Sequence, residues 1–229
     1  MQQQNLKILV LAKQVPDTRN VGKDAMTPEG TVNRAALPAI FNPEDLNALE
    51  AALRLKDRVA GSTVHILTMG PQRAADIIRD AMFRGADGGY LLSGREFAGS
   101  DTLATSYALS CALKKIAPDV IFAGRQAIDG DTAQVGPQIA EKLGIPQVSY
   151  AADIQKEGET LTIKRMLEDG YMTIKVKTPC LITCIKELNE PRYMSVGGIF
   201  ECYEKPYEVF DYNTLKDDPL IDPITIGLK

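Results

Sequence analysis

The chain has 229 residues, of which 45% are apolar and 24% are charged. These values are ordinary for a globular protein with one hydrophobic core, and they exclude a disordered chain and a fibrous repeat. The formal net charge of −4 argues against nucleic acid and anionic membranes as partners.

Short apolar runs alternate with helical patterns over the first 143 residues. Residues 6–12 form an apolar run of the kind that a parallel sheet covers on both faces. The segment Asn42-Pro43-Glu44-Asp45 offers a capping residue, a proline for the first helical position and two acids for the first turn, so a helix is predicted to begin there. The predicted strands are 6–12, 62–68, 88–93 and 119–123, and the predicted helices cover 43–53, 77–82, 100–116 and 132–143.

The pattern changes beyond residue 146. Residues 160–166 and 171–177 alternate around Asp169-Gly170, which predicts a hairpin within residues 158–178. Residues 180–185 form a further apolar strand that is expected to return to the main sheet. Residues 201–229 hold seven acidic and three basic residues, carry the whole net charge and are interrupted by prolines. They are predicted to form an extended arm on a partner.

The fold class that follows is α/β, with helices on both faces of a sheet whose core is five parallel strands. One domain is expected to cover residues 1–200, and the arm covers residues 201–229. In such an open sheet, ligands bind outside the carboxyl ends of the strands, near the point where the strand order reverses.

Histidine and cysteine contribute little reactive chemistry. The single histidine, His65, lies inside the apolar run of residues 64–67, so a half-buried strand position is a simpler interpretation than a catalytic triad. The four cysteines (Cys111, Cys180, Cys184 and Cys202) form no CxxC pair and lack zinc-finger spacing. Cys180 and Cys184 would be about 13 Å apart along a strand, too far to bridge. We therefore expect no metal and no catalytic side chain.

With reduced cysteines, no signal peptide and no long apolar run, we expect a cytoplasmic protein without membrane insertion.

The segment Gly124–Pro137 (GRQAIDGDTAQVGP) is the most informative loop. It joins a predicted strand to a predicted helix, whose free amides would form an anion site suited to a phosphate. It lacks the GK[ST] ending of a Walker A loop and the GxGxxG pattern, so nucleotide binding is favoured over hydrolysis. A turn capped by Asp131 or Thr132 is the structural alternative. A second helix start at Ser100-Asp101-Thr102 is either a simple N-cap or another anion or ribose site.

Four segments resemble the beta subunits of electron transfer flavoproteins. They are Leu9–Pro16 (LVLAKQVP), the FNPED segment at residues 41–45, Gly124–Pro137 and Leu188–Tyr193 (LNEPRY). The resemblance implies a nucleotide-binding fold like that of adenine nucleotide hydrolases and a heterodimer with an alpha subunit, which the arm would contact. In this family the beta-subunit site holds AMP in simple electron carriers and FAD in electron-bifurcating members. GDTAQVGP and residues 97–105 make the chain more similar to the bifurcating group.

The resemblance also implies roles for individual residues. The adenosine and ribose would lie against residues 11–13, Asn42 and residues 68–69. The phosphates would bind the amides of residues 132–135, and the isoalloxazine would lie near residues 101–105. The loop at residues 188–200 would dock an acyl-CoA dehydrogenase. The implied cofactor residues are Leu11, Ala12, Lys13, Asn42, Thr68, Met69, Asp101, Thr102, Thr105, Gly124, Arg125, Gln126, Ala127, Asp129, Gly130, Asp131, Thr132, Ala133, Gln134 and Val135, and the implied docking residues are Leu188, Tyr193, Met194, Val196, Ile199 and Phe200.

The implied activity is that of an oxidoreductase subunit, with no catalysis by the isolated chain. NADH would reduce the FAD, one electron would pass through an alpha-subunit FAD to an acyl-CoA dehydrogenase or enoyl-CoA reductase, and the other would pass to ferredoxin or flavodoxin. Three alternatives are an AMP-binding carrier, a bifurcating subunit serving a lactate-type dehydrogenase, and an ATP-binding module like those of stress proteins. The absence of a Walker A lysine and the presence of the FNPED and NEPRY segments count against the ATP-binding module.

Overall fold

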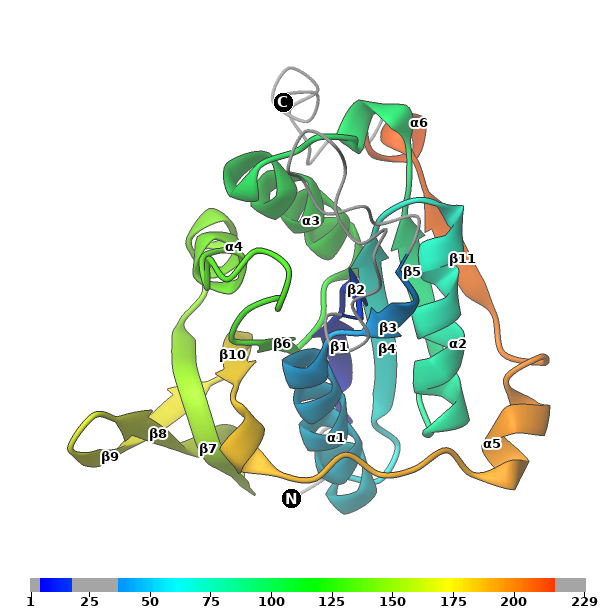
Figure 1. Ribbon diagram of the computed structural model, residues 1–229. Helices are drawn as coiled ribbons and strands as arrows, with labels where there is room; N and C mark the ends of the chain where they lie inside the picture. The colour runs from blue at the N-terminus through cyan, green and yellow to red at the C-terminus, as the bar shows by residue number, and fades with distance from the viewer. Residues whose placement is uncertain (1–4, 18–36, 217–229) are drawn as a thin grey trace.

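A computed structural model describes residues 5–17 and 37–216 (Figure 1). The order along one nine-stranded sheet is β11-β5-β4-β1-β6-β10-β7-β8-β9, and β2 and β3 form a separate two-stranded ribbon. The strands are β1 (Lys7–Leu11), β2 (Gln14–Pro16), β3 (Ala39–Phe41), β4 (Thr63–Met69), β5 (Gly88–Leu92), β6 (Val120–Gly124), β7 (Gln147–Glu157), β8 (Thr160–Leu167), β9 (Gly170–Lys177), β10 (Cys180–Cys184) and β11 (Tyr207–Phe210). The α-helices are α1 (Pro43–Arg58), α2 (Ala75–Phe83), α3 (Thr102–Ile116), α4 (Val135–Leu143), α5 (Val196–Glu201) and α6 (Tyr212–Lys216), and the 3₁₀ turns are Gln72–Ala74, Arg95–Phe97 and Lys186–Leu188.

The predicted α/β class is confirmed. The five strands that the sequence predicts as parallel are β1, β4, β5, β6 and β10, and each pairs in parallel with its neighbour. The predicted hairpin is also present, because β8 pairs antiparallel with β9. The strand β7 joins the hairpin to the core: it runs parallel to β10 on one side and antiparallel to β8 on the other.

Helices cover both faces of the parallel core. On one face, β1 and β4 pack against α1 and α2 through one apolar cluster that includes Leu49, Leu53 and Ile78. On the other face, a second cluster joins the sheet to α3 and α4 through residues such as Leu109, Leu113 and Ile139. Successive strand residues point to opposite faces, so continuous apolar runs such as that of β1 fill both clusters. The result is a doubly wound sheet.

The strand order reverses between β1 and β6. From β1 the chain moves through β4 to β5 on one side, and then returns with β6 to the other side of β1. β1 and β6 stay paired up to Leu11 and Ala123, and the loops that follow them leave in different directions. This is the position at which open parallel sheets bind their ligands.

Two segments differ from the sequence expectation. The helix predicted from Thr132 begins instead at Val135, because Asp131 (φ 46°) and Ala133 (φ 52°) are left-handed and no α-helix contains such residues. The described part of the expected arm forms β11, which pairs in parallel with β5, followed by α6. The predicted arm beyond residue 216 and the segment at 18–36 lie outside the described residues.

His65, Cys180 and Cys184 lie in strands as expected, whereas Cys111 lies in α3 and Cys202 just after α5. His65 is a half-buried residue of β4, and burial lowers its pKa. All four cysteines are buried and unbridged, and burial raises the pKa of Cys180 to about 12, so this thiol stays protonated. No cluster of metal-ligating side chains is present in the described ranges. None of the helices described is both long and apolar enough to cross a membrane.

Candidate functional site

A cavity of about 970 Å³ lies at the carboxyl edge of the sheet, across the strand-order reversal. The ends of β1, β4, β5 and β6 form one wall, and the starts of α3 and α4 form another. Every cofactor residue implied by the sequence lines this cavity except Asn42 and Thr68. Residues from four loops far apart in the sequence are thus brought together.

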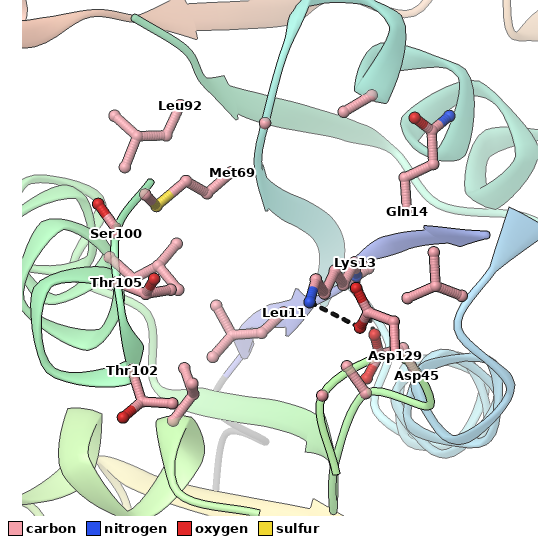
Figure 2. A pocket seen from close by; sticks show the side chains of 18 of the residues that line it. Leu11, Lys13, Gln14, Asp45, Met69, Leu92, Ser100, Thr102, Thr105 and Asp129 are labelled. Atoms are coloured by element: carbon pink, nitrogen blue, oxygen red, sulfur yellow. Dashed lines mark hydrogen bonds and ion pairs between the residues drawn. The ribbon is translucent and has the colours of Figure 1, made fainter. Parts of the chain in front are cut away.

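The cavity has a charged side and an opposite side of mixed apolar and hydroxyl-bearing side chains (Figure 2). On the charged side, the Nζ of Lys13 donates to Oδ1 of Asp129 at 2.7 Å, and the Asp129 side chain is only 3% exposed. This ion pair holds the loop after β6 to the end of β1. Figure 2 shows the opposite side lined by Leu92, Met69, Ser100, Thr105 and Thr102, with Leu11 between the two sides.

The loop between β6 and α4 presents an anion site. No described side chain caps the N-terminus of α4, whose first residues are Val135 and Gly136. The amides there are therefore open to an acceptor, and the helix dipole favours a negative one. The left-handed conformations of Asp131 and Ala133 turn the chain sharply just before the helix, and Thr132 lies between them.

The start of α3 is different. The side chain of Asp101 caps this helix by accepting a hydrogen bond from the amide of Ala104 at 2.8 Å. A carboxylate already occupies this helix end, so a phosphate is disfavoured here and the N-cap interpretation of the sequence holds. The hydroxyl of Thr102 donates to Oε1 of Gln134 at 3.1 Å, which joins the two helix starts along one wall of the cavity.

The start of α1 braces the loop after β6. The side-chain nitrogen of Asn42 donates to the backbone carbonyl of Gln126 at 2.9 Å, and the side-chain oxygen of Asn42 accepts from the backbone amide of Ile128 at 3.1 Å. Glu44 pairs with Arg125 at 3.0 Å, and burial raises the Glu44 pKa while Arg125 opposes that shift. The FNPED segment therefore positions the loop through its side chains, in addition to starting a helix.

Two of the predicted cofactor residues, Asn42 and Thr68, do not line the cavity. Asn42 is fully buried and supports the loop without lining the cavity. Thr68 is also fully buried, and its hydroxyl has no hydrogen-bond partner in the part of the chain that the structure describes. It lies in β4 next to Met69, which does line the cavity.

Sequence reasoning missed one central residue, Asp45. It lines the cavity, is 7% exposed and accepts from the backbone amides of Lys13 (2.8 Å) and Gly124 (2.9 Å). The FNPED segment includes Asp45, but as an acid in a first helical turn it is already explained by the helix dipole. Lining residues outside the predicted cofactor set also include Gln14, Gly70, Arg73, Leu92, Ser93, Gly94 and Arg95.

Gly124 is required at the end of β6 by this packing. A Cβ there would overlap Oδ1 of Asp45 and lie 2.9 Å from the Asp45 backbone nitrogen. We expect Gly124→Ala to lower the free energy of unfolding by about 1–3 kcal/mol. Gly130→Ala is the matched control, because a Cβ at Gly130 meets no atom within 4 Å. Chemical denaturation of the two variants measures the difference, and equal stability would contradict this packing.

The predicted docking residues lie on the surface around α5. Tyr193 is 93% exposed, Val196 and Phe200 are each 74% exposed, and Met194 and Ile199 are also exposed. Leu188 differs, because it is half-buried against the first apolar cluster. The structure therefore collects five of the six on one exposed stretch of chain, residues 193–200, and places Leu188 apart from it, beside α1 and β7.

Ion pairs and hydrogen bonds anchor this stretch to α1 and α2. Arg192 donates to the buried carboxylate of Glu50 at 2.8 Å and to Asp57 at 2.9 Å. Burial tends to raise the Glu50 pKa, but hydrogen bonds from Arg192 and Arg54 lower it overall, so this carboxylate stays ionised. The amide of Ser195 donates to a carbonyl at the end of α2. The exposed apolar side chains are thus presented by a fixed backbone.

Comparisons with known proteins match residues 29–210 to the electron transfer flavoprotein domain. The chain is 58% identical over 228 residues to the acryloyl-CoA reductase electron transfer subunit gamma of Anaerotignum propionicum. It is 51% identical over 225 residues to subunit CarD of the caffeyl-CoA reductase–Etf complex of Acetobacterium woodii, and 50% identical over 224 residues to an electron transfer flavoprotein subunit beta of Clostridium acetobutylicum. Each match covers 98% of this chain and 84% of the relative.

Proposed function

The chain belongs to the electron transfer flavoprotein family, in the role of a beta subunit, and we propose that it is the FAD-binding beta subunit of an electron-bifurcating complex. Its partner would be an alpha subunit with its own FAD. The observation that carries this proposal is the extent of the cavity, which runs from the α4 start past the α3 start to the ends of β4 and β5. A mononucleotide requires only the first part of that path.

The residues present fit a flavin dinucleotide. A volume of about 970 Å³ is at the upper end of the range for ligand sites, and beyond Leu11 the side chains of Leu92 and Met69 offer apolar contacts to a flat ring. The uncapped start of α4 suits a diphosphate, whereas the start of α3 carries the Asp101 carboxylate. The charge distribution therefore favours phosphates at α4 and an uncharged ring near Thr102 and Thr105.

When bound, FAD would supply the redox chemistry, by accepting a hydride from NADH and releasing electrons singly. The chain's own residues bind and orient. The amides at the α4 start hold the phosphates, and the loop braced by Lys13, Asn42 and Asp45 fixes their position. No side chain of this chain acts as an acid or nucleophile in the proposal.

We propose that one electron passes through the alpha subunit to an acyl-CoA dehydrogenase or enoyl-CoA reductase, and the other to ferredoxin or flavodoxin. The reductase names of two relatives support the first route. The exposed stretch at residues 193–200 is the proposed docking surface, since anchored, exposed apolar side chains mark interaction sites. The unbridged cysteines suit a cytoplasmic location.

Two other functions remain in the same family. A beta subunit that binds only AMP would use the α4 start and leave the opposite side of the cavity unused. A subunit serving a lactate-type dehydrogenase would share the FAD site and differ at the docking surface. The extent of the cavity beyond the α4 start favours FAD over AMP, and the relatives named for CoA-ester reductases favour an acyl-CoA partner.

We expect two FAD and no AMP for each alpha–beta pair, and NADH should bleach the absorbance of one of them first. The physical reason is that the dinucleotide fills both sides of the cavity, so its ring lies where a nicotinamide can stack. Flavin and nucleotide are counted by chromatography after denaturation. One FAD plus one AMP for each pair would refute the bifurcating function and leave a simple electron carrier.

A further inference from the structure

Asp45 occupies an unusual position for a carboxylate. It is 7% exposed and lies where the sheet order reverses, between the carboxyl ends of β1 and β6. One oxygen accepts from the amide of Lys13, just after β1, and the other accepts from the amide of Gly124, the last residue of β6. A single side chain thus ties together the two strand ends whose loops diverge around the cavity.

The residue type is closely determined. Two backbone donors point at two side-chain oxygens, and an asparagine could accept from only one of them because its nitrogen is a donor. A glutamate is one methylene longer, and there is no spare room, since even a Cβ at Gly124 would overlap the Asp45 oxygen. The carboxylate also faces the cavity, so its two bonds connect directly to the cavity floor.

We propose that Asp45 is a positioning residue for the bound nucleotide, which it influences through the backbone of Lys13 and Gly124. Lys13 in turn holds Asp129, and Gly124 begins the loop that leads to the α4 start. Both links to the nucleotide site, through Lys13 and through Gly124, therefore depend on the Asp45 carboxylate. This inference rests on the proposed function for the existence of the nucleotide, but concerns a residue that neither the composition nor the loop pattern indicates.

The position also makes the support sensitive to pH. Burial raises the Asp45 pKa to about 7, against the opposing effect of the two amides and of Asn42. The charged groups around it are Glu44 on the same helix, which raises the pKa further and pairs with Arg125, the Lys13–Asp129 pair, and Cys184 on β10, whose thiol is kept protonated by burial.

The sign of the pH effect follows from the two bonds. Only the ionised form accepts from both amides without a competing proton, so the support is complete above pH 7 and weakens as the pH falls through 7. Nucleotide affinity should decrease from pH 8 to pH 6. The stability of the nucleotide-free fold should change in the opposite direction through this group, because a pKa raised above its unfolded value favours the protonated folded state at low pH.

Titration of FAD into the nucleotide-stripped alpha–beta pair tests the proposal. For the wild-type pair we expect the affinity to fall between pH 8 and pH 6, with a proton released on binding near pH 7. For Asp45→Asn we expect an affinity at pH 8 about tenfold weaker or more, with the pH dependence lost. The control is Asp76→Asn, which removes an exposed carboxylate of α2 outside the cavity and should leave both quantities unchanged.

Wild-type affinity together with the wild-type pH slope in Asp45→Asn would overturn the proposal. If this variant fails to fold, the wild-type measurement decides instead: an affinity that is flat from pH 8 to pH 6, with no proton released, also overturns it. If the wild-type pair binds AMP in place of FAD, the bifurcating function fails. The same comparison of Asp45→Asn with wild type at pH 8, made with AMP, still decides the role of Asp45.

Discussion

Replacing Thr132 by glutamate is expected to remove the nucleotide from the beta-subunit site. Thr132 is exposed and lines the cavity between two left-handed residues, three positions before the uncapped start of α4. A carboxylate there would face the phosphates, and two like charges about 4 Å apart repel by about 1 kcal/mol in water and about 4 kcal/mol near a protein surface. We expect an affinity about 100-fold weaker. Chromatography of the purified alpha–beta pair should then find one FAD remaining, that of the alpha subunit.

Thr132→Gln is the matched control, because it has the size and shape of glutamate without the charge. Both variants keep the backbone amides that are proposed to hold the phosphates, and neither changes a buried residue, so both should fold with nearly wild-type stability. Full nucleotide content in a folded Thr132→Glu pair would contradict a phosphate at this helix start. Equal losses in both variants would show that side-chain size, and not charge, matters.

The sheet core could be predicted because its signal is local. The runs that became β1, β6 and β10 are almost continuously apolar, since helices cover both faces of these strands. The hairpin could be predicted equally well, because polar and apolar residues alternate along β8 and β9 on either side of a short turn. In each case a few neighbouring residues contain the information that determines the structure.

The start of α4 could not be placed from the same patterns. Apolar spacing is compatible with a helix from Thr132, and Ala133 is a good helix former, yet its φ of 52° excludes it from the helix. Asn42, Lys13 and Glu44, which lie far from this loop in the sequence, bind it through hydrogen bonds and ion pairs, and these contacts fit the left-handed turn. Such long-range constraints override local preference. They also explain why β11 was missed: it is a short, half-exposed strand stabilised by pairing with β5.

Asp45 shows the same limit at the level of function. A local interpretation, an acid in the first turn of a helix, is physically sufficient, so a single sequence gives no reason to seek a second role. The bonds to Lys13 and Gly124 span 32 and 79 positions of sequence and become visible only in the folded chain. The open-sheet rule locates the strand ends, so a ligand site could be expected there from the sequence, and the cofactor residues implied by the family resemblance stay a prediction. Asp45, which ties those ends together, could not be identified in the same way.

Replacing Met194 and Phe200 together by glutamate is expected to abolish coupling to the acyl-CoA-dependent partner. The two side chains are 44% and 74% exposed, so their replacement should leave the fold and the nucleotide cavity intact. In a docked complex the new carboxylates would be buried without partners, which costs several kcal/mol and corresponds to a loss of affinity of about 100-fold or more. Reduction of the acyl-CoA substrate at limiting partner concentration measures the loss, while NADH oxidation by an artificial acceptor should be unchanged.

The control is the double variant Tyr171→Glu with Met172→Glu, which changes another exposed aromatic residue and another exposed methionine. These residues belong to β9, at the end of the sheet order opposite to β5 and β11, whereas α5 packs against α2. The docking surface at residues 193–200 is anchored through Arg192 to the buried Glu50, so its geometry does not depend on the hairpin. If coupling survives in Met194→Glu with Phe200→Glu, or falls equally in the hairpin variant, the reductase binds elsewhere and the exposed stretch around α5 must contact something else.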